Sequence, residues 1–276
     1  MKTIALIFDF DDTLAPDSTS AFLESMGVNA ADFWKNEVHP LDNDDWDPIP
    51  AYMFALLKLS ASSPDNIITR QRLADFGRKL KFHKGLTRFF DQMREFAHSL
   101  DPDLRLEFYV ISSGIGEIIR SSRIAHHFTE IWASDFLYND AGHIVFPRKI
   151  ISFTEKTRYV FQVSKGIIGK KSKGNPFEVN KKVQYKDFKV RLEHMIFVGD
   201  GLTDIPCFSL IKRYNGVTFA VYDKNRPDRW GRAWNFIEDG RVSNLLSANY
   251  SADSDLSTNL KMAVQNIYRK IQEEQG

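Results

Sequence analysis

The hydrophobic positions of this chain follow two different periods. Short, continuous apolar runs that stop at polar or glycine residues are typical of strands buried on both faces of a sheet. Such runs predict strands at 4–8, 106–111, 130–134, 195–198 and 217–222. Elsewhere apolar residues recur at helical spacing, as in 86–97 and 256–271. This pattern predicts an α/β fold whose core is a Rossmann-like, doubly wound parallel sheet.

Predicted strands and helices alternate along the chain, except in one long interval, 15–83, which has helical patterns only. The predicted helices lie at Ser20–Met26, Ala30–Val38, Ile49–Leu59 and Ile67–Leu80. Pro48 and Pro50 suit the start of a helix, and Pro64 suits a break between two helices. The sequence therefore predicts two domains: an α/β core at 1–14 and 84–276, and an inserted all-helical cap at 15–83.

Composition agrees with a globular protein and excludes several other classes. Of the 276 residues, 43% are hydrophobic and 26% are charged, which is ordinary for a folded domain. The net charge of +1 gives no strong field, so we expect neither nucleic acid nor a membrane as a partner. The single Cys207 excludes an internal disulfide and suits a reducing compartment. The first eight residues are too short an apolar segment for a signal peptide, so we expect a cytoplasmic protein.

Two carboxylates, Asp9 and Asp11, directly follow the first predicted strand. In open α/β sheets ligands bind beyond the carboxyl ends of the strands, and residues i and i+2 of an extended chain share a side. One carboxylate can then act as a nucleophile while the other gives and takes protons. Close like charges need a cation between them, and Mg²⁺ prefers oxygen ligands and pairs with phosphate. The same residues also suit a plain turn after a strand.

Three further polar groups recur at expected strand and helix ends. Ser112 follows the run 106–111 with a hydroxyl that can bind a phosphate oxygen. Asp200 and Asp204 follow the run 195–198 and are candidate Mg²⁺ ligands. Lys156 lies in the first turn of a predicted helix, where the helix dipole disfavours a cation. Taken singly, Ser112 suits a turn and Lys156 suits a solvated surface charge.

Together these residues resemble the four motifs of the haloacid dehalogenase (HAD) superfamily, over the stretch from Ile4 to about Pro206. The resemblance implies that Asp9 is the nucleophile and Asp11 the general acid and base. It also implies that Ser112 and Lys156 bind the phosphoryl oxygens. Lys149 and Lys165 flank Lys156, and spacing alone does not choose among these three lysines.

The resemblance further implies a Mg²⁺ site and a branch of the superfamily. The implied metal ligands are Asp9, Asp200, Asp204 and the Phe10 carbonyl, with Asp11 as a neighbouring side chain. The dehalogenase branch lacks a second Asp at the position of Asp11, so a phosphohydrolase is favoured. Thr13-Leu14 and the Gly199-Asp200-Gly201-x-x-Asp204 segment resemble the phosphoserine-phosphatase-like branch with a helical cap between the first and second motifs. Asp12 and the Ser113-Gly114 pair depart from the usual pattern of that branch.

These observations predict a Mg²⁺-dependent phosphatase that hydrolyses a small phosphorylated metabolite through an aspartyl-phosphate. A phosphotransferase or mutase, and a catalytically silent domain that binds a phosphorylated ligand, are the alternatives, and fold does not name the substrate. We expect cap aromatic residues to read the substrate, namely Phe22, Phe33, Trp34, Trp46 and Tyr52. The lysine-rich stretch 165–189 is interpreted as a solvated loop, with binding of an anionic substrate tail as the alternative.

Overall fold

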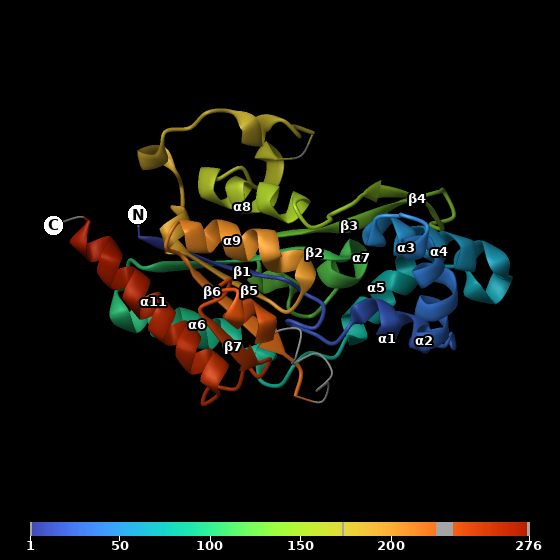
Figure 1. Cartoon of the computed structure of the whole chain (residues 1–276), viewed down its shortest axis with the longest axis horizontal. Helices are drawn as coiled ribbons and strands as arrows, with labels where there is room; N and C mark the ends of the chain where they lie inside the picture. The colour runs from blue at the N-terminus through green and yellow to red at the C-terminus, as the bar shows by residue number, and fades with distance from the viewer. Residues whose placement is uncertain (1, 173, 225–233, 275–276) are drawn as a thin grey trace.

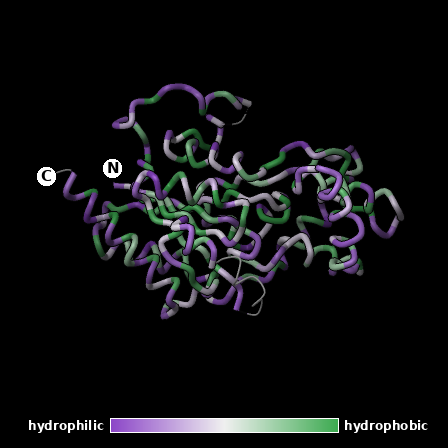
Figure 2. The backbone as a smooth tube through the Cα atoms, in the orientation of Figure 1, coloured by the Kyte–Doolittle hydropathy of each residue, from purple (hydrophilic) through white to green (hydrophobic). Residues whose placement is uncertain are grey.

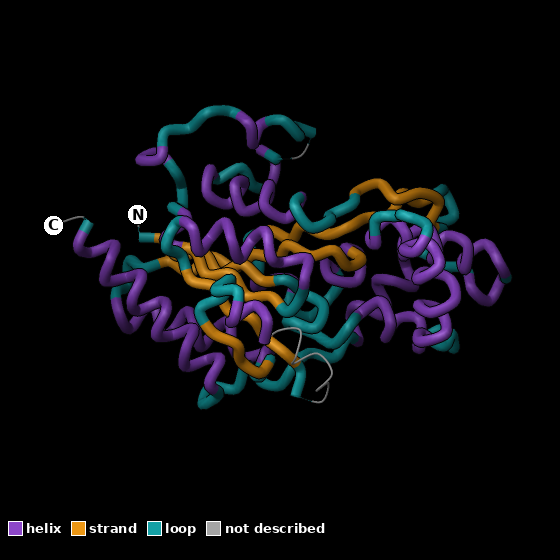
Figure 3. The backbone as a smooth tube through the Cα atoms, in the orientation of Figure 1, coloured by secondary structure: helices purple, strands orange, loops and turns teal. Residues whose placement is uncertain are grey.

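The computed structural model describes residues 2–172, 174–224 and 234–274, and its centre is a seven-stranded sheet (Figures 1 and 3). The strands are ordered β4-β3-β2-β1-β5-β6-β7, and every neighbouring pair is parallel except the antiparallel β3 and β4. Their bounds are β1 (Thr3–Phe8), β2 (Arg105–Ile115), β3 (Glu130–Tyr138), β4 (Ile144–Lys149), β5 (Met195–Gly199), β6 (Val217–Tyr222) and β7 (Asn244–Ser247). The predicted α/β class and mostly parallel sheet are confirmed.

Strand β1 lies in the middle of the sheet and carries the hydrophobic core on both faces. All six of its residues are buried, and it pairs with β2 on one side and β5 on the other. Ile4, Leu6 and Phe8 point into one apolar cluster, whereas Ala5 and Ile7 point into a second. Because successive side chains of a strand alternate between faces, one uninterrupted apolar run supplies both clusters.

Helices cover each face of the sheet, and the hydrophobic colour of Figure 2 gathers along the central strands. Helices α6 (Leu86–Leu100) and α11 (Asp255–Glu273) pack on the Leu6 face, and their buried residues share its cluster. Helices α8 (Glu155–Lys165) and α9 (Ile205–Arg213) pack on the Ile7 face. The short α7 (Gly116–Arg120) directly follows β2. No helix in the described part of the chain is long and apolar enough to cross a membrane.

The predicted helical interval is helical throughout most of its length and forms one end of the molecule (Figure 1). It contains α1 (Ser18–Ser25), α2 (Ala30–Phe33), a π-helical turn (Trp34–Val38), α3 (His39–Asn43), α4 (Pro48–Ser62), a 3₁₀ turn (Pro64–Asn66) and α5 (Arg70–Lys79). The sequence missed α3, which contains Pro40. The division of the chain into core and cap domains stays a prediction.

The last predicted helix of this interval begins three residues later than its sequence pattern indicates. Thr69 is extended and bridges to His143 at the tip of the β3–β4 hairpin. The Ile144 amide donates to the Ile68 carbonyl at 3.1 Å, and the Arg70 amide donates to the Gly142 carbonyl at 2.8 Å. The Thr69 hydroxyl then accepts from the Arg72 amide and caps α5. Tertiary pairing and a cap residue therefore set this helix start, and the pattern of apolar residues does not.

Candidate active site

The chain turns sharply where β1 ends, and the turn fixes the two predicted carboxylates. The Asp9 amide donates to the Val198 carbonyl at 2.9 Å, which continues the pairing of β1 with β5. The Phe10 carbonyl accepts three backbone amides, from Thr13, Leu14 and Ala15, at 2.8 to 3.3 Å. These three bonds hold the Phe10 carbonyl in the turn, and its role as a metal ligand stays a prediction.

Lys156 is the centre of a buried polar cluster. Its side chain is fully buried, and Nζ lies 2.8 Å from Asp9 Oδ2, 2.7 Å from Asp204 Oδ1 and 3.0 Å from Thr203 Oγ1. Burial acts to lower the pKa of Lys156, but the charges of Asp204 and Asp9 outweigh it and raise the pKa above its usual value. A lysine predicted by itself as a solvated charge is therefore a fixed, buried cation.

The other two lysines considered from the sequence lie elsewhere. Lys165 Nζ donates to the carbonyls of Val179 and Lys181, at 2.6 and 2.8 Å. Lys149 Nζ lies over the Tyr159 ring, 5.2 Å from its centroid. Of the three, Lys156 is the lysine that the fold brings to Asp9.

Asp200 and Asp204 complete a group of three carboxylates at the end of β5. Ligand oxygens of Asp9, Asp200 and Asp204 lie within 4.8 Å of one another. Asp204 is fully buried, and its second oxygen accepts from the Gly201 amide at 3.2 Å, so both its oxygens are hydrogen-bonded. Burial, together with the charges of Asp9 and Asp204, raises the pKa of Asp200 well above its usual value. Three carboxylates around one lysine leave an excess of negative charge, and this oxygen-rich donor set fits a divalent cation such as Mg²⁺.

The side chains of Asp11 and Ser112 both lie against Gly114. The Ser112 hydroxyl accepts from the Gly114 amide at 3.0 Å, and Asp11 Oδ1 accepts from the Ser18 amide at 2.8 Å, at the start of α1. A Cβ on Gly114 would lie 2.2 Å from Asp11 Oδ2 and 3.3 Å from Ser112 Oγ. The glycine therefore gives the Asp11 carboxylate the space it occupies. Burial, followed by the charge of Asp17, raises the pKa of Asp11 to about 7.

One aromatic side chain of the helical interval reaches this site. Tyr52, on α4, is buried and its hydroxyl donates to the Ser113 carbonyl at 2.7 Å. Its ring lies 6.0 Å from that of Trp34, whose Nε1 donates to the Ser20 hydroxyl. Phe22 and Phe33 are buried in the hydrophobic cluster, and Trp46 is half-exposed against Phe54. Of the five aromatic residues considered from the sequence, Tyr52 makes the direct bond to the Ser112 segment.

Sequence reasoning missed two residues of the site, Thr13 and Thr203. The Thr13 hydroxyl lies 3.5 Å from Asp200 Oδ1, and Thr203 is one of the three partners of Lys156. Both lie inside segments that already attracted attention, between Asp9 and Leu14 and between Gly199 and Asp204. A search for hydroxyls within those segments, and not for carboxylates alone, would have found them.

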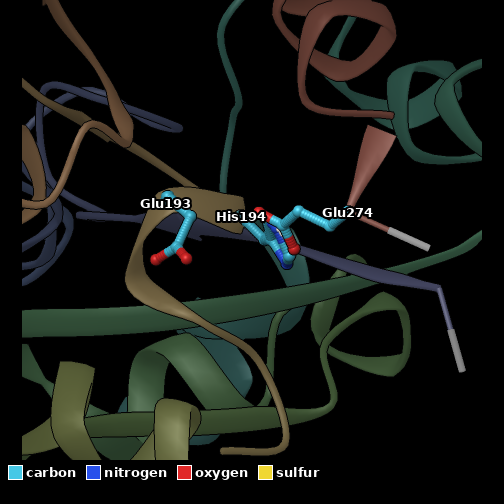
Figure 4. Close-up of side chains that lie close together, drawn as sticks. All are labelled: Glu193, His194 and Glu274. Atoms are coloured by element: carbon cyan, nitrogen blue, oxygen red, sulfur yellow. Dashed lines mark ion pairs between the residues drawn. The ribbon is translucent and has the colours of Figure 1, made fainter. Parts of the chain in front are cut away.

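A second group with metal-ligand chemistry lies at the other edge of the sheet. Glu193 and His194 immediately precede β5, and Glu274 follows α11 (Figure 4). The Arg191 guanidinium already lies 2.6 Å from Glu274 and 4.0 Å from Glu193. A metal ion bound here would have to compete with Arg191 for both carboxylates. We therefore assign the group to the ion pairs and not to a metal site.

No protein-family model matches the sequence. An uncharacterized protein of Borreliella burgdorferi strain B31 is 25% identical over 279 residues, which cover 92% of this chain and 93% of that protein. A HAD family hydrolase of Salmonella enterica serovar Typhi superposes with a TM-score of 0.58 at 10% identity, covering 91% of this chain and 71% of the other. A phosphoserine phosphatase, solved as an analogue of its phospho-aspartyl intermediate, superposes with a TM-score of 0.55 at 14% identity, covering 95% and 99%.

These structural similarities establish the fold. The chain has the fold of the HAD superfamily of hydrolases. The phosphoserine phosphatase has this same fold. The fold implied by the motif resemblance is thereby confirmed.

Proposed function

We propose that this protein is a Mg²⁺-dependent phosphatase that hydrolyses a small phosphomonoester through an aspartyl-phosphate on Asp9. The observation that carries the proposal is the buried Lys156 ammonium held between Asp9 and Asp204, with Asp200 beside them and Asp11 next to Ser112. A nucleophile, a proton carrier and a phosphate-binding cation thus lie at one edge of the sheet. The phosphoserine phosphatase of the same architecture supports this reading through its phospho-aspartyl intermediate analogue.

In the first half of the reaction, an Asp9 oxygen attacks the phosphorus atom of the ester. A new bond forms between that oxygen and phosphorus, and the bond from phosphorus to the ester oxygen breaks. Asp11 gives its proton to the departing oxygen, so the product leaves as a neutral alcohol. Lys156 and the Ser112 hydroxyl bind the phosphoryl oxygens as negative charge builds on them.

In the second half, water replaces Asp9 on phosphorus. Asp11, now deprotonated, takes a proton from the attacking water, and the Asp9 carboxylate is released with inorganic phosphate. A pKa of about 7 suits a group that must both give and take a proton near neutral pH. Asp9, Asp200 and Asp204, whose carboxylate oxygens lie within 4.8 Å of one another, are the residues that would hold Mg²⁺. The ion supplies positive charge that offsets the charge of the phosphoryl group.

The substrate's remaining atoms have to be read outside this cluster, because its residues suit only the phosphoryl group and the metal ion. We propose that the helical interval recognises these atoms, since its Tyr52 hydroxyl donates a hydrogen bond to the Ser113 carbonyl, next to Ser112. Closing an active site in this way excludes water and positions the substrate. We therefore assign substrate choice to the cap and propose a small phosphorylated metabolite as the substrate class.

The test is turnover of an aryl phosphate by purified wild-type and variant proteins in the presence of Mg²⁺. Asp9→Asn removes the nucleophile and should abolish turnover while leaving the melting temperature close to that of the wild type. Asp11→Asn should also cripple turnover but leave phosphate on Asp9, because loss of the base affects the water step most. Mass spectrometry of the acid-quenched protein detects that adduct. Near wild-type turnover by Asp9→Asn would sink the nucleophile assignment.

A further inference from the structure

A cavity of about 730 Å³ lies between β3, the end of β4 and α8. We call it the β3–α8 groove. Figure 1 shows these elements side by side, next to the segment that follows α8. The residues that matter for its chemistry are Trp132, Arg148, Lys149, Arg158, Tyr159 and Gln162. None of Asp9, Asp11, Ser112 and Lys156 lines the groove, so it is distinct from the candidate active site.

The groove carries more positive than negative charge. Five cationic and three acidic side chains line it. Each of the three carboxylates already has a partner: Glu117 has Arg70 at 3.2 Å, Asp135 has Arg120, and Glu130 accepts from the Gly169 amide at 2.8 Å. Glu130 keeps its negative charge, and Arg158 is already paired with Glu155 at 2.6 Å. Arg148 and Lys149 are therefore the cations that a ligand would meet.

Two of these cations, Arg148 and Lys149, are poorly neutralised. The side chain of Arg148 is 63% exposed, and its nearest carboxylate contact, to Asp135, is 3.9 Å long. No carboxylate in the described part of the chain lies within 4.0 Å of Lys149 Nζ. Burial lowers the pKa of Lys149, which lies against the Tyr159 ring, and the charges of Asp135 and Glu130 offset this lowering only in part. A bound anion would supply the missing charge.

Two residues that line the groove, Arg158 and Gln162, each carry a buried polar atom without a hydrogen-bond partner among the described residues. Gln162 is 2% exposed, and its Oε1 has no hydrogen-bond partner among the described residues. Arg158 Nε also has no hydrogen-bond partner among the described residues, although the other guanidinium nitrogens of Arg158 contact Glu155 and the Pro176 carbonyl. Buried polar groups of folded proteins are nearly always paired, so such exceptions indicate a ligand or an ordered water. Arg158 Nε calls for an acceptor, and Gln162 Oε1 calls for a donor.

We propose that the β3–α8 groove binds a small hydroxylated polyanion, a polycarboxylate or a phosphorylated polyol. Its anionic groups pair with Arg148, Lys149 and Arg158, and a hydroxyl donates to Gln162 Oε1. A volume of about 730 Å³ is typical of a small-molecule pocket, which favours a metabolite over a nucleic acid or a peptide. This site is additional to the proposed phosphatase site and does not depend on that activity.

Isothermal titration calorimetry tests the proposal with citrate and with glucose 6-phosphate, on protein dialysed free of divalent cations so that nothing is hydrolysed. Citrate cannot be a phosphatase substrate, so its binding stands whether or not the proposed reaction is correct. The groove variant Arg148→Gln/Lys149→Gln should bind about tenfold more weakly or worse, because two charge-assisted contacts are lost. The control variant Lys79→Gln/Arg269→Gln makes the same change in net charge at two exposed positions and should bind like the wild type. The probe that binds better identifies the carboxylate or the phosphate class.

Gln162 provides a test that leaves every charge in place. Tricarballylate is citrate without the hydroxyl, so the wild type should prefer citrate and Gln162→Leu should lose that preference. If the groove double variant fails to fold in a thermal melt, Arg148→Glu, at an exposed side chain, replaces it and should weaken binding by a similar factor. Absence of binding by the wild type, unchanged affinity in the groove variant, or an equal loss in the control variant would each overturn the proposal.

Discussion

At the scale of single residues, Tyr52 is the point at which the helical interval contacts the catalytic segment. Its hydroxyl donates to the Ser113 carbonyl, one residue after the proposed phosphate-binding Ser112. Tyr52→Phe keeps the buried ring and removes the hydrogen bond. A neutral hydrogen bond contributes about 1 kcal/mol, so we expect kcat/KM for an aryl phosphate to fall by ~5- to 10-fold.

The matched control for Tyr52 lies at the far end of the molecule. Tyr268 also donates its hydroxyl, to Asp101 at 2.9 Å, away from the site. Tyr268→Phe should lower the melting temperature slightly and leave kcat/KM unchanged. Steady-state kinetics and thermal melts of both variants separate the two roles. Equal kinetics for Tyr52→Phe and the wild type would show that the cap is held closed by other contacts.

At the scale of elements, the close approach of α5 to α7 connects the helical interval to the end of β2. Gly77, in α5, is buried, and a Cβ at this position would lie 2.4 Å from the Ile118 carbonyl oxygen and 3.1 Å from Ser121 Cβ. Glycine in a helix normally costs stability relative to alanine, by about 1 kcal/mol. Here the sequence tolerates that cost because only glycine lets the two helices touch.

Gly77→Ala should therefore destabilise the protein, opposite in sign to the helix-propensity expectation. Overpacking of this kind costs ~1–3 kcal/mol of unfolding free energy, measured by denaturant titration. Lys79→Ala, at an exposed position of the same helix, is the control and should change stability by less than about 0.5 kcal/mol. A Gly77→Ala protein more stable than the wild type would mean that α5 and α7 separate at no cost.

At the scale of the whole molecule, the carboxylate cluster makes stability depend on pH and on metal. Burial is the first cause that raises the pKa of Asp11 and of Asp204 to about 7, from 3.8 when unperturbed. These two carboxyls therefore bind more protons in the folded metal-free protein than in the unfolded chain between about pH 4 and pH 7. The stability that they contribute is fully present below that range and is lost as pH rises through it.

We expect the melting temperature of the metal-free protein to decrease from pH 5 to pH 8, and Mg²⁺ to raise it again at pH 8. Binding to the folded state alone contributes about 2.7 kcal/mol when free Mg²⁺ is a hundredfold above its Kd. Asp200→Asn should lose most of the Mg²⁺ shift, whereas Asp103→Asn, at an exposed position, should keep it. Identical melts with Mg²⁺ and with chelator would contradict the metal role.

The sequence by itself determined the sheet and the position of its chemistry. The runs at 4–8, 106–111 and 195–198 are β1, β2 and β5, because strands buried on both faces must be apolar at every position. Asp9 and Asp200 follow β1 and β5, and neighbouring parallel strands bring their carboxyl ends to one edge. Ser112 was expected after the end of its strand, but β2 continues to Ile115 and Ser112 lies within it. The half-buried β7 was missed, since four residues with two polar ends give no clear period.

Only the tertiary structure decided which residues act together. Lys149, Lys156 and Lys165 are equivalent by spacing, and the contact of Lys156 with Asp9 spans 147 residues of chain, so no local pattern encodes it. The Phe10 carbonyl accepts three amides of the turn after β1, which the motif by itself did not indicate. Gly77 looks like a weak point of a helix until α7 is placed against it. Local periodicity reports which face of an element is buried, whereas the partners of a buried polar group depend on packing between elements distant in sequence.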